Sequence, residues 1–128
     1  MVVEWQQAEE GIRRYLKEWW GQEFKKEKLL LKTNEGELEL ELDAVSEDGE
    51  IIAEIKCTKH PEHPREMQLV LDDIHRLEAV RTKRKLLFLV DPLFYQVFCR
   101  KHQKDLLRWK QKGIEIVSPF ELGSYLGG

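Results

Sequence analysis

The feature that most constrains the fold is the alternation of acidic and apolar residues from Glu37 to Val45. Successive side chains of a strand point to opposite faces, so this pattern predicts a β-strand with one apolar face. A turn signal follows at residues 46–49, where Asp48-Gly49 is a strong hairpin dipeptide. The apolar run at residues 51–57 then predicts the returning strand. The first half of the chain should therefore contain an antiparallel hairpin.

The remaining pattern predicts helices and strands in the order α-β-β-β-α-β-α-β-α. Helices are expected at residues 2–20, 67–80, 91–112 and 119–126, and strands at 29–31, 37–45, 51–57, 85–90 and 114–117. Turn residues Asn34-Glu35-Gly36 separate the first two strands. A hairpin followed by β-α-β crossovers predicts an α/β fold with a mixed sheet flanked by helices.

Length and composition narrow the class of protein. The 128 residues match one domain, and 41% hydrophobic with 35% charged residues is typical of a folded, highly charged chain. No apolar run approaches the roughly 20 residues that a membrane-spanning helix needs. The first ten residues lack the pattern of a signal peptide, and Cys57 and Cys99 fit reduced thiols. We expect a single domain over residues 1–128, cytoplasmic and without a membrane partner.

The expected hairpin brings two carboxylates together. A two-residue loop at Asp48-Gly49 would place Asp43 directly opposite Glu54, with their Cβ atoms about 4.5–5.5 Å apart on one face. The same register puts Leu42 opposite Ile55 and Leu40 opposite Cys57 on the apolar face. Lys56 would point the same way as Glu54 because it lies two residues further along.

Two carboxylates this close repel each other unless a positive charge lies between them. A hard divalent cation such as Mg²⁺ accepts such oxygen ligands, and a neighbouring lysine can contact a phosphate. The alternative interpretation of Asp43, Glu54 and Lys56 is an exposed, charged strand face, which is how we interpret Glu37, Glu39 and Glu41.

Asp43, ten further residues and then Glu54-Ile55-Lys56, set among elements in this order, resemble the PD-(D/E)xK nuclease superfamily. The resemblance extends from about residue 2 to residue 90, although Leu42 stands where a proline would complete the literal motif. It implies a restriction-endonuclease-like αβββαβ core with a C-terminal α-β-α extension. It also implies that Asp43, Glu54 and the Ile55 carbonyl hold Mg²⁺ or Mn²⁺, and that Lys56 is the catalytic lysine.

The resemblance further implies a glutamate on the first helix near the metal, and Glu9 is the candidate, with Glu10 as the fallback. Helical spacing places Glu9 on the face of Trp5, Ile12 and Leu16, so it should point inward. The alternative is a surface glutamate that the helix dipole favours in the first turn.

Gln68 lies early on the helix expected at residues 67–80, where the RecB-like branch of the superfamily often carries a glutamine. Asp72 stands where that branch usually has a tyrosine. The alternative for Gln68 is an ordinary exposed helix residue.

Basic residues are concentrated in one stretch. Residues 81–112 contain ten basic and two acidic residues, which favours contact with phosphate or simply solvated helix faces. The residues proposed for contact with the DNA backbone are Arg81, Lys83, Arg84, Arg100, Lys101, Lys104 and Arg108.

The sequence thus favours a metal-dependent nuclease acting on DNA. The alternatives are a non-catalytic module that binds nucleic acid or protein, and an accessory subunit that needs a partner. A domain this small has little surface for recognising a DNA sequence, so a homodimer or a partner protein is also expected as an alternative.

Other residues that could form a site carry weaker signals. Cys57, His60 and His63 have a spacing that could hold a soft metal, but no fourth ligand is evident. His75 and His102 are expected on helix surfaces, and Trp19 in the core.

Overall fold

The computed structural model describes residues 5–33 and 36–126, and the side chains of all of these except residues 31–33. The expected helix start at residues 2–4 and the turn residues Asn34 and Glu35 lie outside the described residues. The elements are α1 (Trp5–Trp20), β1 (Phe24–Thr33), β2 (Gly36–Ser46), β3 (Ile51–Lys56), α2 (Pro64–Glu78), β4 (Arg84–Leu89), α3 (Pro92–Lys101), α4 (Gln103–Gln111), β5 (Ile114–Val117), η1 (Pro119–Glu121) and η2 (Gly123–Leu126).

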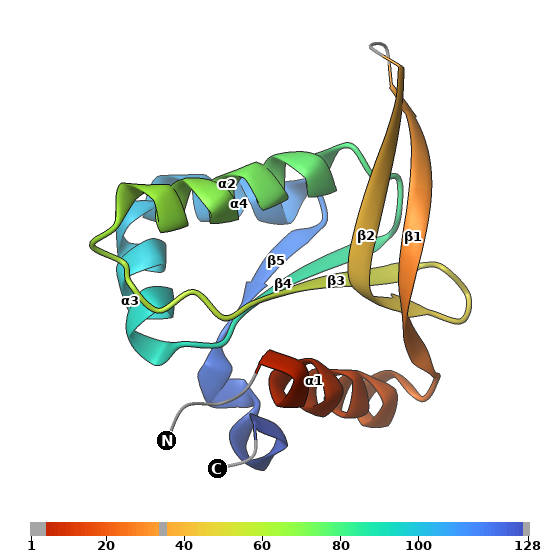
Figure 1. The fold of residues 1–128 in the computed structure, drawn as a ribbon, viewed down its shortest axis with the longest axis horizontal. Helices are drawn as coiled ribbons and strands as arrows, with labels where there is room; N and C mark the ends of the chain where they lie inside the picture. Colours follow the sequence, from red (N-terminus) through yellow and green to blue (C-terminus); the bar gives the residue numbers. More distant parts are fainter. Residues whose placement is uncertain (1–4, 34–35, 127–128) are drawn as a thin grey trace.

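The five strands form one mixed sheet in the order β1-β2-β3-β4-β5. β1, β2 and β3 are antiparallel neighbours, whereas β3, β4 and β5 run parallel. α1 covers one face of the sheet, and α2, α3 and α4 cover the other (Figure 1). The prediction of an α/β fold with a mixed sheet flanked by helices is confirmed.

Each face of the sheet has its own hydrophobic core. The core under α1 contains Ile12 and Leu16 with Ala53 and Phe88 of the sheet. The core under the other helices is larger, and its buried members include residues from α2, α3 and α4. Because β3 alternates between the two cores, its exact register decides which face each of its side chains reaches.

β2 changes its partner along its length. It pairs with β1 from Gly36 to Ser46, but with β3 only through Ala44↔Ala53 and Val45↔Ile52. These two pairs confirm the offset predicted for the hairpin. The predicted pairs Asp43–Glu54, Leu42–Ile55 and Leu40–Cys57 are wrong, because from Asp43 back toward Gly36 the strand leaves β3 and the β1–β2 hairpin projects from the sheet (Figure 1).

A β-bulge marks the point of departure. Lys25 pairs with Val45 and Glu27 with Leu42, so two steps along β1 match three steps along β2. The bulge breaks the expected alternation, since Leu42 lies in the core under α2 and Ala44 in the core under α1. Bulges re-aim side chains at the point where they occur, and here the re-aimed residue is Asp43.

The connection between β2 and β3 is longer than the expected two-residue loop, because residues 47–50 separate the strands. The N–H of Gly49 donates to the carbonyl of Ser46 at 2.9 Å. Gly49 has a φ of 72°, a conformation that glycine adopts without strain.

The expected helix at residues 91–112 is two helices, broken at His102 with a φ of −113° and a ψ of 26°. In one straight helix Phe98 and Trp109 would lie roughly 16 Å apart along the axis. The break allows their rings to stack with centroids 6.0 Å apart. His102, expected at the surface, packs against Phe98 with centroids 4.8 Å apart. Burial of these aromatic rings therefore overrides helix continuity.

The C-terminal segment lies against α1, and the expected helix at residues 119–126 consists of two 3₁₀ turns. A Cβ added to Gly11 would lie 1.8 Å from the carbonyl oxygen of Tyr125, so only glycine permits this approach. Trp19 is 69% exposed, which contradicts its expected burial, and Trp20 packs against the core instead. No helix within residues 5–33 and 36–126 has the length and apolar character needed to cross a bilayer.

Candidate functional site

Glu54 and Lys56 point to the α2 side of the sheet. Ala53 and Ile55, which alternate with them, belong to the core under α1. The ammonium of Lys56 lies 2.5 Å from the carboxylate of Asp73 on α2. The predicted sharing of one strand face by Glu54 and Lys56 therefore brings both side chains to the space between β3 and α2.

Asp43 is held at the point where β2 and β3 separate. Its carboxylate accepts a hydrogen bond from the N–H of Ile55 at 2.8 Å, and its carbonyl accepts one from Arg13 at 3.1 Å. The side chain thus replaces the backbone acceptor that β3 loses when β2 turns away. This contact fixes the Asp43 carboxylate beside Glu54.

Glu54 has the most strongly perturbed carboxyl group in the site. Its pKa is raised to about 8, first by burial and then by the negative charge of Asp43, while Lys56 opposes the rise. One oxygen, Oε1, is buried without a hydrogen-bond partner among the described residues. A carboxyl in this state binds a proton or a cation more readily than an exposed one does.

Glu9 approaches the same place from α1. Its side chain points inward and is 7% exposed, as predicted, whereas Glu10 is exposed. Burial raises the pKa of Glu9, and a hydrogen bond with Asp43 and the Asp43 charge raise it further. Lys26 on β1 lies 3.9 Å from Glu9 and opposes this rise.

The three carboxyl groups form a chain with Asp43 in the middle, which we call the acidic cluster: Glu9, Asp43 and Glu54. The carboxylate oxygens of these three residues do not all lie within 4.8 Å of one another. In the described part of the chain, the only three His, Cys, Asp or Glu residues whose ligand atoms all lie within 4.8 Å of one another are His60, Glu62 and His63.

Asp73 is a site residue that the sequence reasoning missed. It is 4% exposed and forms ion pairs with both Lys56 and Arg76. The available signal was its position on the buried stripe of α2, between Val70 and Leu77. A carboxylate on such a stripe requires a cationic partner, because burial of an unpaired charge is costly.

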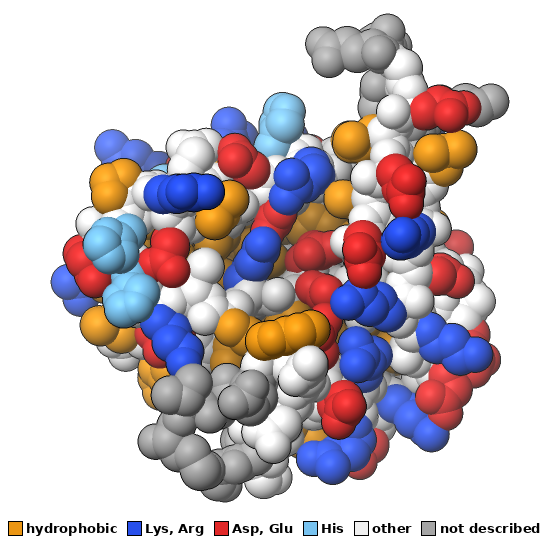
Figure 2. Space-filling model, viewed as in Figure 1, with side chains coloured by type: hydrophobic (Ala, Val, Ile, Leu, Met, Phe, Trp, Pro, Cys, Tyr) orange, Lys and Arg blue, Asp and Glu red, His pale blue; other side chains and the backbone are white. Residues whose placement is uncertain are grey.

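A cleft of about 250 Å³ opens beside the cluster, between the β1–β2 hairpin and α2. Its lining residues are Leu38, Glu39, Leu40, Glu41, Glu54, Asp73 and Arg76. Acidic side chains gather in this region, with lysine and arginine side chains on both sides (Figure 2). Glu54 is therefore accessible from a groove that β2 creates by leaving β3.

The basic residues next to the cluster are not the predicted ones. Arg13 on α1 and Lys26 on β1 contact it, and Arg76 on α2 pairs with Asp73. Arg100 and Lys101 are on α3, and Lys104 and Arg108 are on α4. Arg108 pairs with Asp105 at 3.2 Å.

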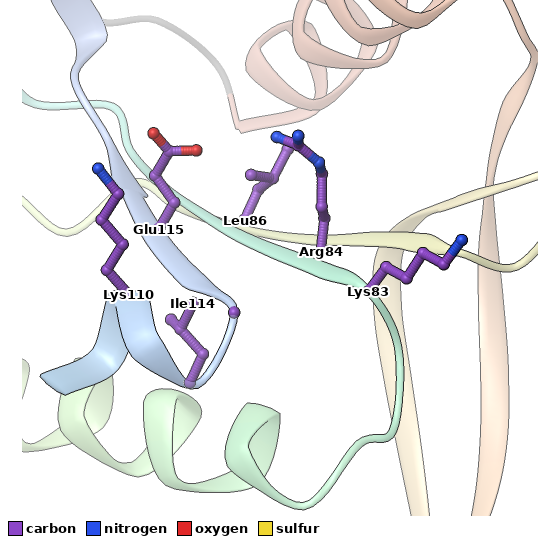
Figure 3. A pocket seen from close by; sticks show the side chains of 7 residues that line it. Lys83, Arg84, Leu86, Lys110, Ile114 and Glu115 are labelled. Carbon is purple, nitrogen blue, oxygen red and sulfur yellow. The ribbon is translucent and has the colours of Figure 1, made fainter. Parts of the chain in front are cut away.

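Arg81, Lys83 and Arg84 lie before or at the start of β4, and Arg84 is level with Ile51 at the opposite end of β3 from Lys56. Lys83 and Arg84 line a cavity of about 430 Å³ with Lys110. The basic groups of this cavity do not converge, since Lys83 extends away from Arg84 and Lys110 (Figure 3). The Arg84 guanidinium lies over the Trp20 ring instead, 4.7 Å from its centroid.

Gln68 lies on the exposed side of α2, and its amide donates to Asp72 at 2.9 Å. The buried residues of that helix, including Asp73, form a different face. The structure therefore does not bring Gln68 to the acidic cluster.

No protein-family model, no curated protein and no solved structure matches the chain significantly. A functional assignment therefore depends on the geometry and chemistry of the chain's own residues.

Proposed function

We propose that this chain is a divalent-metal-dependent nuclease that hydrolyses DNA phosphodiester bonds on a restriction-endonuclease-like PD-(D/E)xK fold. The observation that carries the proposal is the buried carboxyl of Glu54, held beside Asp43 with Lys56 on the same strand face. The helix, the bulged hairpin and the following helix–strand unit bring these residues together in the order that the resemblance implies.

The residues fit a hard cation. Glu54 has an unpartnered buried oxygen, and its pKa is raised first by burial and then by the negative charge of Asp43. Asp43 and Glu54 would hold Mg²⁺ or Mn²⁺, with Glu9 and the Ile55 carbonyl as the further ligands, because these ions take oxygen donors. When bound, such an ion supplies polarisation of the scissile phosphate and acidification of a water molecule.

Lys56 would stabilise negative charge that develops on the phosphate. Asp73 orients its ammonium through the 2.5 Å contact. Asp43 keeps the peptide of Ile55 in place through the 2.8 Å hydrogen bond, so the two neighbours of Ile55 in the sequence, Glu54 and Lys56, stay aligned. Lys26 and Arg76 flank the cluster and supply positive charge for phosphate groups that enter the cleft.

The test is DNA cleavage with Mn²⁺ or Mg²⁺, using circular duplex, linear duplex and single-stranded substrates. Lys56→Ala should abolish cleavage while Mn²⁺ binding remains. The matched control is Lys112→Ala, a lysine at the end of α4 that pairs with a carboxylate, Glu78, outside the cluster. Equal cleavage by Lys56→Ala and the parent chain would reject the role given to Lys56.

The ion pair between Lys56 and Asp73 favours a second function, a non-catalytic module that binds nucleic acid or protein. In that case the lysine would serve to neutralise a buried aspartate. This function predicts that the chain binds DNA or protein without cleavage at any metal concentration. It also predicts that the bound partner dissociates no faster from Lys56→Ala than from the parent chain.

A further inference from the structure

A second group of metal-binding side chains lies in the loop between β3 and α2, outside the acidic cluster. The ligand atoms of His60, Glu62 and His63 all lie within 4.8 Å of one another. We propose that these three residues form a site for a borderline-soft divalent cation of the Zn²⁺ class.

The distances suit a tetrahedral ion. Ligands at about 2.0–2.1 Å from Zn²⁺ are about 3.4 Å from each other. Nδ1 of His60 lies 3.3 Å from Oε1 of Glu62, and Nε2 of His63 lies 4.0 Å from the same oxygen. All three side chains are exposed, so small rotamer changes can bring the third edge to the required length.

The backbone of the loop is already ordered for this geometry. The N–H of His63 donates to the carbonyl of His60 at 3.1 Å, which closes a turn that contains Pro61. The His63 carbonyl accepts from Glu66 and Met67 at the start of α2. Because Pro61 and Pro64 have fixed φ angles, little backbone freedom is left to lose when a ligand binds.

The donor set selects the ion. Two imidazoles and one carboxylate, with a water in the fourth position, are the ligands of open zinc sites. Imidazole favours Zn²⁺ and its neighbours over Mg²⁺.

Glu62 takes the place of Cys57, the ligand that the sequence spacing suggested. Cys57 packs against the core under α1 rather than beside the imidazoles. The loop site is also separate from the acidic cluster, since none of Glu9, Asp43 and Glu54 joins the group of ligand atoms that His60, Glu62 and His63 form. One ion therefore does not bridge the two sites.

The test is a calorimetric Zn²⁺ titration of the untagged full-length chain carrying Asp43→Asn and Glu54→Gln, which removes the acidic cluster as a competing site. We expect one equivalent to bind with a micromolar or lower dissociation constant. Adding His60→Ala and His63→Ala should weaken binding at least about tenfold, because two of three ligands are lost. Adding His75→Ala, an exposed histidine on α2, should leave binding unchanged.

Imidazole NMR resonances supply an independent readout on the parent chain. Zn²⁺ should shift the signals of His60 and His63 and leave those of His75 in place. Absence of saturable binding, binding that survives the loss of both histidines, or equal shifts at His75 would each overturn the proposal. None of these outcomes depends on nuclease activity.

Discussion

The carboxylate of Asp43 accepts a hydrogen bond from the backbone N–H of Ile55 at 2.8 Å, at the position where β2 stops pairing with β3. One side chain thereby closes the end of the ladder and places a negative charge beside Glu54. The contact coincides with the bulge in the β1–β2 ladder, where Asp43 and Ala44 lie between the paired residues Leu42 and Val45.

Asp43→Asn separates these two roles. The amide oxygen can still accept from Ile55, but the negative charge is gone. We expect the pKa of Glu54 to fall below its value of about 8, yet to remain above 4.5 because burial is its first cause. A carbon-detected NMR titration of the Glu54 carboxyl measures this. An unchanged pKa in the variant would show that the Asp43 charge does not reach Glu54.

Glu54 should make the stability of the metal-free chain depend on pH. Its pKa is about 8 in the folded chain, against an ordinary value of 4.5, so the folded state keeps the proton longer than the unfolded state does. The resulting stabilisation is complete below pH 4.5 and is lost as the pH rises to 8. The free energy of unfolding should decrease by up to about 1.4 kcal/mol per pH unit in this window.

Glu54→Gln should remove most of that dependence on pH. The free energy of unfolding of the variant should therefore rise relative to that of the parent chain as the pH increases. Urea denaturation with a chelator present, at pH 5 and at pH 8, supplies the comparison. Parallel losses of stability in both chains would contradict the assignment to Glu54.

Asp73→Asn should weaken the ion pair that positions Lys56. Removing one partner of a buried ion pair leaves an uncompensated charge and lowers the free energy of unfolding by about 3–5 kcal/mol. The loss should be smaller here, because Lys56 and Arg76 reach solvent. The neighbouring Asp72→Asn, on the exposed side of α2, is the matched control and should cost less than about 0.5 kcal/mol. Chemical denaturation of both variants measures the difference in the free energy of unfolding. Equal losses in the two variants would show that the ion pairs of Asp73 do not stabilise the fold.

Gly11→Ala should destabilise the chain although alanine is the better helix former. Propensity alone would give a gain of up to about 1 kcal/mol. The added Cβ would meet the Tyr125 carbonyl oxygen at 1.8 Å, so the C-terminal turns must move away from α1. A loss of about 1–3 kcal/mol is expected from such overpacking. A higher melting temperature in the variant would contradict the close approach.

Several parts of this fold follow from the sequence because they depend on local periodicity. Alternation between residues 37 and 45 predicted β2, and the Asp48-Gly49 turn signal predicted the offset confirmed by Ala44↔Ala53. Helical spacing predicted that Glu9 points inward.

The features that sequence reasoning missed depend on contacts distant in the chain. The bulge at Asp43 depends on the pairing of β2 with β1, in which two steps along β1 match three steps along β2. The break at His102 depends on stacking of Phe98 on Trp109, and the burial of Asp73 depends on Lys56 of β3. Helical or strand periodicity within a single segment contains no information on such pairings.

The proposed metal site at Asp43 and Glu54 is tested most directly by a calorimetric titration of Mn²⁺ into the parent chain beside the Asp43→Ala/Glu54→Ala double variant. We expect saturable binding that the double variant lacks. Binding at pH 7 should also release a proton, because Glu54 has a pKa of about 8 without metal, so the measured heat should change with the ionisation enthalpy of the buffer. Equal binding by both chains, or binding by neither, would contradict the assignment of Asp43 and Glu54 as metal ligands.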